Sequence, residues 1–189
     1  MEKRIFDFLA ALAFLVIIVP VVPFIAVWIK ATSSGPIIFR QVRLGYRGAP
    51  FTMFKFRTME DKTWQPFDVV LSGDDRVTEP GRFLRKTHLD ELPQLVNVLL
   101  GQMSMVGPRP LQAEIIEKRI QEVSAYAHRL DIRPGLTGLE QIQGRMWSLR
   151  RGIRCGLRLD IFYISHHCIW LDLRILCRTV STVLRCKGI

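Results

Sequence analysis

Hydrophobic residues are concentrated at the beginning of this chain. A nearly continuous apolar run extends from Ile5 to Ile29 and is broken by Asp7 and by two prolines, Pro20 and Pro23. A helix that crosses a bilayer needs about 20 apolar residues, so the run is long enough to span one. It is about twice as long as the apolar region of a usual cleaved signal peptide, which makes that interpretation a poor fit.

The charges around this run favour a segment that enters the bilayer and returns to the same side. Basic residues flank the run on both sides: Lys3 and Arg4 before it, and Lys30, Arg40, Arg43 and Arg47 after it. Because cytoplasmic flanks are enriched in Lys and Arg, both ends are expected in the cytoplasm. Each proline removes a backbone donor and clashes with the preceding turn. We therefore expect a re-entrant membrane helix over residues 1–30, bent at Pro20 and Pro23, followed by one domain over residues 31–189.

Shorter patterns in the remaining chain predict a mixture of helices and strands. Residues 37–39 indicate a short strand or an interfacial stretch, and the loose alternation over residues 51–58 indicates a half-buried strand. Residues 60–80 are polar and irregular, which is typical of a surface loop. Residues 111–128 indicate a further helix.

The segment from residue 89 to residue 100 has the strongest helical pattern of the domain. Its apolar residues lie at positions 89, 92, 95, 96, 99 and 100, and Gly101 suits the C-terminal end of a helix. Proline is tolerated only in the first helical turn, where amide hydrogens have no partner. Pro93 therefore predicts that this helix begins close to Asp90.

A basic amphipathic helix is expected near the C-terminus. Leu173, Leu176 and Val180 share one helical face, whereas Arg174 and Arg178 share another. Such a helix suits a membrane interface. A surface helix packed on the core has the same pattern, so both interpretations remain open.

The overall charge favours anionic partners. The formal net charge is +10, which suits anionic lipids, phosphorylated substrates or nucleic acid. The apolar run favours a membrane surface, and the chain has no helix-turn-helix or zinc-finger pattern, so no nucleic acid partner is expected.

The last three cysteines, Cys168, Cys177 and Cys186, are spaced so that neighbours point to opposite faces of a helix. We expect the cysteines to be packing residues, not metal ligands.

The adjacent acids Asp90 and Glu91 are the main candidates for chemistry. At a helix start, both carboxylates would lie at the positive end of the helix dipole, which favours their ionised forms. An ionised carboxylate can act as a nucleophile, and a neighbouring one can hold a metal ion or assist proton transfer. Acidic residues also prefer helix starts without any function, so spacing alone leaves both interpretations open.

Turns that combine arginine with glycine or proline surround the acidic pair. They are Gly81-Arg-Phe-Leu-Arg-Lys, Met105-Val-Gly-Pro-Arg-Pro, Arg133-Pro-Gly-Leu-Thr-Gly and Gly144-Arg145. Arginine matches phosphate oxygens with two parallel donors, and glycine lets backbone amides approach them. Together with the acids, these turns predict a site for a diphosphate and a metal ion.

Seven stretches, in order along nearly the whole chain, resemble the bacterial sugar transferase family, the monotopic phosphoglycosyl transferases. They are GPIIFRQVRLG at 35–45, FKFRTM at 54–59, GRFLRKT at 81–87, LDELPQLVNVL at 89–99, GQMSMVGPRP at 101–110, RPGLTG at 133–138 and QGR at 143–145. The resemblance implies a compact, mostly helical α/β domain of the monotopic membrane type, with a re-entrant helix and interfacial amphipathic helices. Residues 31–189 would be its catalytic domain.

The resemblance also implies a reaction. Asp90 would attack the sugar-bearing phosphate of a UDP-sugar, release UMP and hold the sugar phosphate covalently until polyprenyl (undecaprenyl) phosphate accepts it. Glu91 would assist, and Mg²⁺ would sit near Asp90 and neutralise phosphate charge. This is the first membrane step of glycan or exopolysaccharide assembly, at the cytoplasmic face of the bacterial inner membrane. The chain would be a minimal form of the family, since larger relatives carry extra spanning helices and another domain.

Several basic residues match family positions for substrate binding. Arg85 and Arg109 would lie at the phosphate site, joined by Lys55 or Arg57. Arg133 and Arg145 are further candidates for nucleotide contact. A non-catalytic scaffold with a degenerate site is the alternative, and the intact acidic pair together with Arg109 counts against it.

The chain departs from the family pattern at three places that bear on nucleotide-sugar preference. Val19 stands before Pro20 where members often have serine, Leu139 stands where tryptophan is frequent, and His88 replaces a usual serine. The sequence leaves open which sugar is transferred, the carrier length, the pathway and the oligomeric state.

Overall fold

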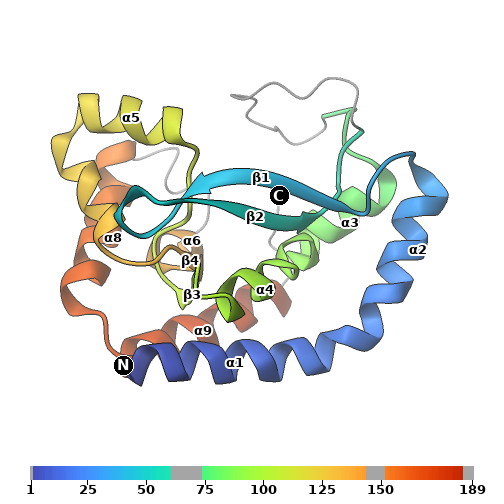
Figure 1. Cartoon of the computed structure of the whole chain (residues 1–189), viewed down its shortest axis with the longest axis horizontal. Helices are drawn as coiled ribbons and strands as arrows, with labels where there is room; N and C mark the ends of the chain where they lie inside the picture. Colours follow the sequence, from blue (N-terminus) through green and yellow to red (C-terminus); the bar gives the residue numbers. More distant parts are fainter. Residues whose placement is uncertain (1, 61–73, 144–151, 185–189) are drawn as a thin grey trace.

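The computed structural model describes residues 2–60, 74–143 and 152–184. The described part is mostly helical, as expected, and its strands form two small two-stranded sheets. A long N-terminal helical segment runs beneath the domain and then turns up along one side of it (Figure 1).

The N-terminal apolar run forms two helices joined by a short 3₁₀ turn. Helix α1 (Glu2–Ile18) is followed by η1 (Val19–Val21) and α2 (Val22–Thr32). Pro20 lies in the first turn of η1 and Pro23 lies in the first turn of α2. At such a position a proline costs no backbone hydrogen bond. The bend therefore lies where the prolines predict it. By length and composition, the whole segment is also apolar enough to cross a membrane.

The two sheets differ in direction. Strands β1 (Ile38–Leu44) and β2 (Pro50–Phe56) form an antiparallel hairpin, which confirms the strand predicted over residues 51–58 and extends the one at 37–39. Strands β3 (Ser104–Val106) and β4 (Gly135–Thr137) pair in parallel at the centre of the domain.

Glycine is required beside this parallel pair. A Cβ on Gly135 would lie 2.0 Å from the amide nitrogen of Gly107, and one on Gly138 would lie 2.3 Å from the Gly107 carbonyl oxygen. Any side chain at these positions would push the backbones apart. The glycines thus fix the loop that follows β3, which carries Arg109.

The predicted helix around residue 90 begins as a 3₁₀ turn. Helix α3 (Glu79–Thr87) ends at His88, which has a left-handed φ of 58°. A 3₁₀ turn, η4 (Leu89–Glu91), follows, and α4 (Gln94–Leu99) begins only after Pro93. Helical conformation thus begins at Leu89, close to the predicted start, but residues 89–93 form hydrogen bonds between residues three apart, and the α-helix itself begins only at Gln94. The acidic pair therefore lies in the 3₁₀ turn between α3 and α4.

The second half of the described chain is also more interrupted than predicted. The remaining helical elements are α5 (Ala113–Glu122), η5 (Ser124–Asp131), α6 (Leu139–Ile142), α8 (Ile153–His166) and α9 (Ile169–Leu184). A single helix over 111–128 was wrong, because Val123 adopts an extended conformation with φ −148°. This break separates α5 from η5, which places Tyr126 and Arg129 in the interior.

The apolar core joins the N-terminal helix to the rest of the described chain. The buried members of the main cluster are Ala11, Phe51, Met53, Leu95, Val98, Met103, Met105, Val106, Tyr163 and Ile175. Fully buried Asn97 links α4 to the hairpin, because its amide donates to the Thr52 carbonyl at 2.7 Å and accepts from the Phe54 amide at 3.2 Å. Helix α1 is thus part of the domain's own core.

Helix α9 has both a packed face and an exposed apolar face. It buries Asp172 and Ile175 but leaves Trp170, Leu173 and Val180 exposed. Of the apolar face predicted from the sequence, Leu176 packs against the core, whereas Leu173 and Val180 are exposed, so the packed interpretation holds for Leu176 alone. The second face carries apolar side chains into the surroundings, as an interfacial helix would.

The cysteines do not all pack inside. Cys155 is partly buried, but Cys168 and Cys177 are exposed free thiols, so the packing prediction was wrong for these two. The turn between α8 and α9 carries Cys168 outward, and Cys177 lies on the exposed side of α9. Among the described residues there is no group of three or more His, Cys, Asp or Glu side chains that could hold a metal ion.

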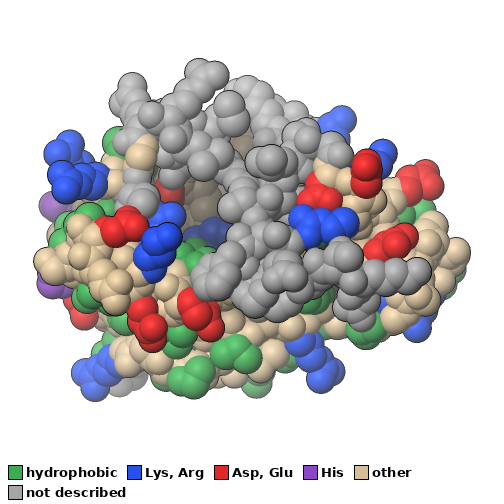
Figure 2. Space-filling view, turned by 90° about the horizontal axis from the view of Figure 1, so that it is seen from above, with side chains coloured by type: hydrophobic (Ala, Val, Ile, Leu, Met, Phe, Trp, Pro, Cys, Tyr) green, Lys and Arg blue, Asp and Glu red, His purple; other side chains and the backbone are tan. Residues whose placement is uncertain are grey.

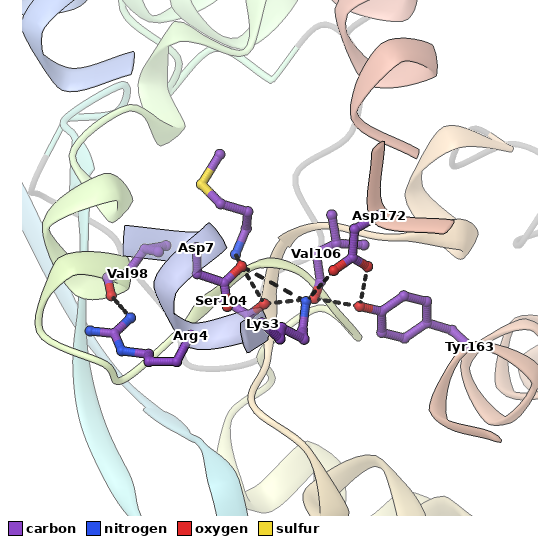
Figure 3. A network of polar contacts seen from close by, with 9 residues as sticks. Lys3, Arg4, Asp7, Val98, Ser104, Val106, Tyr163 and Asp172 are labelled. Carbon is purple, nitrogen blue, oxygen red and sulfur yellow. Dashed lines mark hydrogen bonds and ion pairs between the residues drawn. The ribbon is translucent and has the colours of Figure 1, made fainter. Parts of the chain in front are cut away.

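Charged residues at the start of α1 attach it to the domain (Figure 3). Lys3 Nζ lies 2.5 Å from the Oδ2 atom of Asp172, which is fully buried on α9. The Tyr163 hydroxyl donates to the other oxygen of Asp172 at 2.6 Å. Arg4 donates to the carbonyl oxygens of Val98 and Leu99 at 2.5 and 2.7 Å, at the C-terminal end of α4 where carbonyl groups lack intrahelical partners.

Asp7 adds a buried contact one helical turn later. Its Oδ1 atom accepts hydrogen bonds from Ser104 Oγ at 3.1 Å and from the Met105 amide at 3.0 Å. The carboxylate that interrupts the apolar run is therefore 2% exposed and satisfied by β3. This acidic residue of the apolar run therefore lies inside the protein.

Candidate active site

The acidic pair is held in a tight turn between α3 and α4. The Thr78 hydroxyl accepts a hydrogen bond from the Gly81 amide at 3.1 Å and begins α3. His88 ends that helix, and the following 3₁₀ turn presents Asp90 and Glu91 side by side. Because two helices fix the turn, neither carboxyl group can drift far from the hairpin beside it.

Glu91 is bound by two of the predicted basic residues. Its Oε1 atom lies 2.6 Å from Lys55 Nζ on β2 and 2.6 Å from Arg109 Nη2 in the loop after β3. Burial alone would raise the pKa of Glu91, but the charges of Arg109 and Lys55 outweigh it and hold the pKa well below its usual value. Glu91 is therefore ionised at neutral pH.

Asp90 has a different environment, although it is the next residue. Its side chain is buried, and no described residue donates a hydrogen bond to its carboxylate. Burial raises the pKa of Asp90, opposed by the charge of Lys55 and reinforced by that of Glu91. The prediction that the helix end favours the ionised forms of both acids is thus wrong for Asp90, because desolvation outweighs the weak dipole of a short turn.

Two other predicted cations lie close to the turn but make different contacts. Arg85 Nε donates to the Thr58 hydroxyl at 2.9 Å, and its charge acts on Asp90. Arg57 Nη2 donates to both the carbonyl and the hydroxyl oxygen of Ser33 at 2.8 Å. Arg57 therefore ties the end of β2 to the end of α2 and does not contact the acidic pair.

The remaining candidates lie apart from the turn. Arg133 Nε donates to the Gly101 carbonyl at 2.8 Å, and its guanidinium lies 5.8 Å from the centre of the Tyr46 ring. The structure does not bring it to the acidic pair. Arg145 lies outside the described residues.

Arg43 is a site residue that we did not single out from the sequence. It lies on β1, one residue before the turn to β2, and its guanidinium reaches the Gln41 side chain. Burial and the neighbouring charge of Arg109 lower its pKa to about 10, opposed by Glu91 and Glu114. The sequence did contain a signal for Arg43 as a site residue. It lies in the stretch FRQVRLG, and alternation in a strand puts Gln41 and Arg43 on one face.

Positive charge exceeds negative charge around the acidic pair. Lys55, Arg109, Arg43 and Arg85 all act electrostatically on Asp90, Glu91 or each other. Seen from the side opposite α1, the surface has a central hollow with basic side chains at its floor (Figure 2). Such an excess suits a ligand that brings several negative charges, such as a diphosphate.

The donors present also fit Mg²⁺. This ion keeps several waters and is usually held by one or two carboxylates together with substrate phosphates. Both strong cation contacts go to Glu91, which leaves the Asp90 carboxylate as the donor that a metal ion would use. A set of three protein ligands is not needed for such a site.

Comparison with known proteins adds a consistent result. Residues 1–186 match the bacterial sugar transferase family. A UDP-glucose:undecaprenyl-phosphate glucose-1-phosphate transferase of Caulobacter vibrioides is 43% identical over 192 residues, covering 97% of this chain and 70% of that protein. An uncharacterised sugar transferase of Bacillus subtilis is 39% identical, covering 99% of this chain and 89% of that protein.

A third relative is named for another sugar. A UDP-N-acetylgalactosamine-undecaprenyl-phosphate N-acetylgalactosaminephosphotransferase of Aeromonas hydrophila is 36% identical over 183 residues. The match covers 96% of this chain but 43% of that protein. Similarity of this kind therefore does not select one sugar.

The opposite pKa shifts of the two neighbouring acids predict opposite effects on stability. The folded pKa of Glu91 lies below the unfolded value of about 4.3, so its charge stabilises the fold at neutral pH and that contribution is lost as pH falls. Glu91→Gln should lower the thermal midpoint at about pH 8. The folded pKa of Asp90 lies above about 3.9, so ionising it costs stability as pH rises. Asp90→Asn should raise the midpoint at about pH 8, by a margin that shrinks toward pH 4.

Thermal unfolding of the two variants in detergent, with a chelator to remove metal ions, measures both effects. Each kcal/mol corresponds to about 2–4 °C for a chain of this size. Shifts of the same sign for both variants would contradict the assigned environments.

Proposed function

This chain belongs to the bacterial sugar transferase family, and from that premise we propose that it transfers a sugar 1-phosphate from a UDP-sugar to undecaprenyl phosphate. The names of the Caulobacter and Aeromonas relatives describe this type of transfer with different sugars. The observation that carries the proposal is the acidic pair, in which Glu91 is bound by Lys55 and Arg109 while Asp90 keeps its carboxylate without a described donor.

In the first step, a carboxylate oxygen of Asp90 attacks the phosphorus atom that carries the sugar. The bond from this phosphorus to the bridging oxygen breaks, and UMP leaves with that oxygen. The product is an acyl phosphate in which Asp90 holds the sugar phosphate. Because burial raises its pKa, the ionised Asp90 is poorly stabilised by its surroundings and is a strong nucleophile for a carboxylate.

In the second step, a phosphate oxygen of undecaprenyl phosphate attacks the same phosphorus. The bond to Asp90 breaks, the carboxylate is regenerated, and the diphosphate-linked sugar lipid is released. Arg109 and Lys55 hold Glu91 and stabilise negative charge on the transferred group. Mg²⁺ bound by Asp90 and substrate phosphates would neutralise the charge of the diphosphate.

The membrane helix would bring this site to the lipid carrier. Apolar side chains around the bend are strongly exposed, including Ile17 at 71% and Phe24 at 76%. Burying such a side chain in lipid stabilises by about 1.5–3 kcal/mol. We propose that α1 and α2 enter one leaflet and return, with anionic lipid headgroups around the flanking basic residues.

Contacts at both ends of the helical segment support this topology. Lys3 and Asp7 bind α9 and β3, while Ser33, just after α2, accepts from Arg57. One compact domain thus holds both ends, and a crossing helix would have to break one set of contacts. Since UDP-sugars are made in the cytoplasm, the domain would face the cytoplasm.

Release of UMP from a panel of UDP-sugars, with undecaprenyl phosphate and Mg²⁺ present, tests the proposed reaction. The wild-type protein should release UMP and form a lipid-linked sugar with at least one donor. Arg109→Ala should lower the rate by about 10²-fold or more, because it removes a charge-stabilising donor. Arg178→Ala, on the exposed side of α9, is the matched control and should remain near wild type.

Measuring activity with a chelator present tests the role of Mg²⁺ separately from the other steps of the mechanism. Activity should disappear in excess chelator and return when Mg²⁺ is restored. Full activity in excess chelator would remove Mg²⁺ from the proposal, and absence of UMP release with every donor would overturn the function itself.

Cysteine labelling tests the topology in intact cells. The native cysteines are replaced by serine, and Glu2→Cys or Thr32→Cys is introduced at either end of the helical segment. An impermeant maleimide should label neither position until the cells are opened. Replacing Pro20 and Pro23 with leucine removes the bend, and part of the population should then expose residue 2. Labelling of residue 2 from outside in the parent sequence would mean a spanning helix.

A further inference from the structure

The side chain of Arg109 contacts the acidic pair, and its backbone is also held by a hydrogen bond. Its guanidinium lies 2.6 Å from Glu91, and its backbone carbonyl accepts a hydrogen bond from Arg129 Nη2 at 2.9 Å. Arg129 belongs to η5, a part of the chain remote in sequence from the acids. The loop after β3 is therefore fixed at both its side chain and its backbone.

The Arg129 side chain is buried and is held by contacts with Tyr126 and Asp160. Its Nη1 atom donates to the Tyr126 hydroxyl, and its guanidinium lies 4.8 Å from the centre of the Tyr126 ring. Its Nε atom lies 3.3 Å from Asp160 Oδ2 on α8. Arg129 is 7% exposed and Asp160 is 2% exposed. Nη1 and Nη2 are both hydrogen bonded, and Nε faces Asp160 in an ion pair without a hydrogen bond. A planar guanidinium held at three points has little freedom to turn, so the donor to Arg109 is fixed in direction.

This buried pair is a poor source of stability. Burial raises the pKa of Asp160 to about 7 even though Arg129 lies beside it. Apolar residues of similar volume often replace a buried ion pair without loss of stability. Fixed orientation is therefore the property that the pair supplies and that an apolar pair would lack.

We infer that Arg129, oriented by Asp160, is a positioning residue that holds the Arg109 loop so that the Arg109 guanidinium meets Glu91 beside the nucleophile. A continuous series of contacts leads from α8 through Asp160, Arg129 and the Arg109 backbone to Glu91. A misplacement of about 1 Å at a reacting group can cost about 10²-fold in rate. The inference rests on the proposed sugar-phosphate transfer.

A double-mutant cycle tests whether Arg129 acts through Arg109. Arg129→Met, Arg109→Lys and the double variant are compared for kcat and KM of UMP release with the best UDP-sugar. If Arg129 serves to position Arg109, Arg129→Met lowers kcat by about 10²-fold and the double variant loses little more than Arg109→Lys alone. If Arg129 stabilises the fold only, the two losses multiply, and that result would overturn the inference.

Arg119→Met is the matched control, because Arg119 lies 5.6 Å from the centre of the same Tyr126 ring but has no contact with Arg109. It should keep kcat within about two- to threefold of wild type. Where Arg129→Met does not fold, Arg129→Lys and Asp160→Asn replace it; thermal midpoints identify the folded variants. Full kcat in a folded Arg129 variant would also overturn the inference, whereas an inactive wild type would refute the proposed function instead.

Discussion

The ion pairs of Glu91 are the constraint on which the rest of the site depends. They join three segments that are distant in sequence: the end of β2 through Lys55, the turn between α3 and α4, and the loop after β3 through Arg109. Without this carboxylate, two cations would face each other across a half-buried site. With it, the cations are held close to Asp90 while the Asp90 carboxylate itself remains without a described donor. The two adjacent acids thus acquire different roles from different environments.

The same strand connects the site to the membrane segment. Lys55 and Arg57 lie two residues apart at the end of β2, where Lys55 holds Glu91 and Arg57 holds Ser33 after α2. At the other end of the segment, the fully buried Asp172 accepts from Lys3 and from Tyr163. The helical segment is therefore a component of the domain. In the proposed topology, the depth of the bend in lipid would set the height of the candidate site above the membrane.

Local patterns in the sequence predicted the parts of the fold that depend on neighbouring residues. Pro20 and Pro23 located the bend, and alternation located the second strand of the hairpin. The acidic pair, Lys55 and Arg109 were found because their motifs are distinctive. The 3₁₀ form of residues 89–93 and the left-handed conformation of His88 could not be predicted, because an apolar stripe does not distinguish a 3₁₀ turn from the first turn of an α-helix.

Burial and long-range contacts account for the other differences. The burial of Asp7 could not be predicted from its neighbours in sequence, because its donors, Ser104 and Met105, belong to β3 far along the chain. The raised pKa of Asp90 follows from desolvation, which no local pattern reports. Arg43, Arg129 and Asp160 contact the site only through packing of separate elements, although a lone acid in the apolar face of α8 was a signal for Asp160.

The central claim is that Asp90 is the nucleophile, and trapping its adduct tests this most directly. The protein is mixed with a UDP-sugar and Mg²⁺ in the absence of undecaprenyl phosphate, and its intact mass is measured. If Asp90 is the nucleophile, the wild type gains the mass of one sugar phosphate, and peptide mapping locates it on Asp90. The adduct disappears on addition of undecaprenyl phosphate and is absent from Asp90→Asn. An adduct of the same mass on the Asp90→Asn protein would contradict the account.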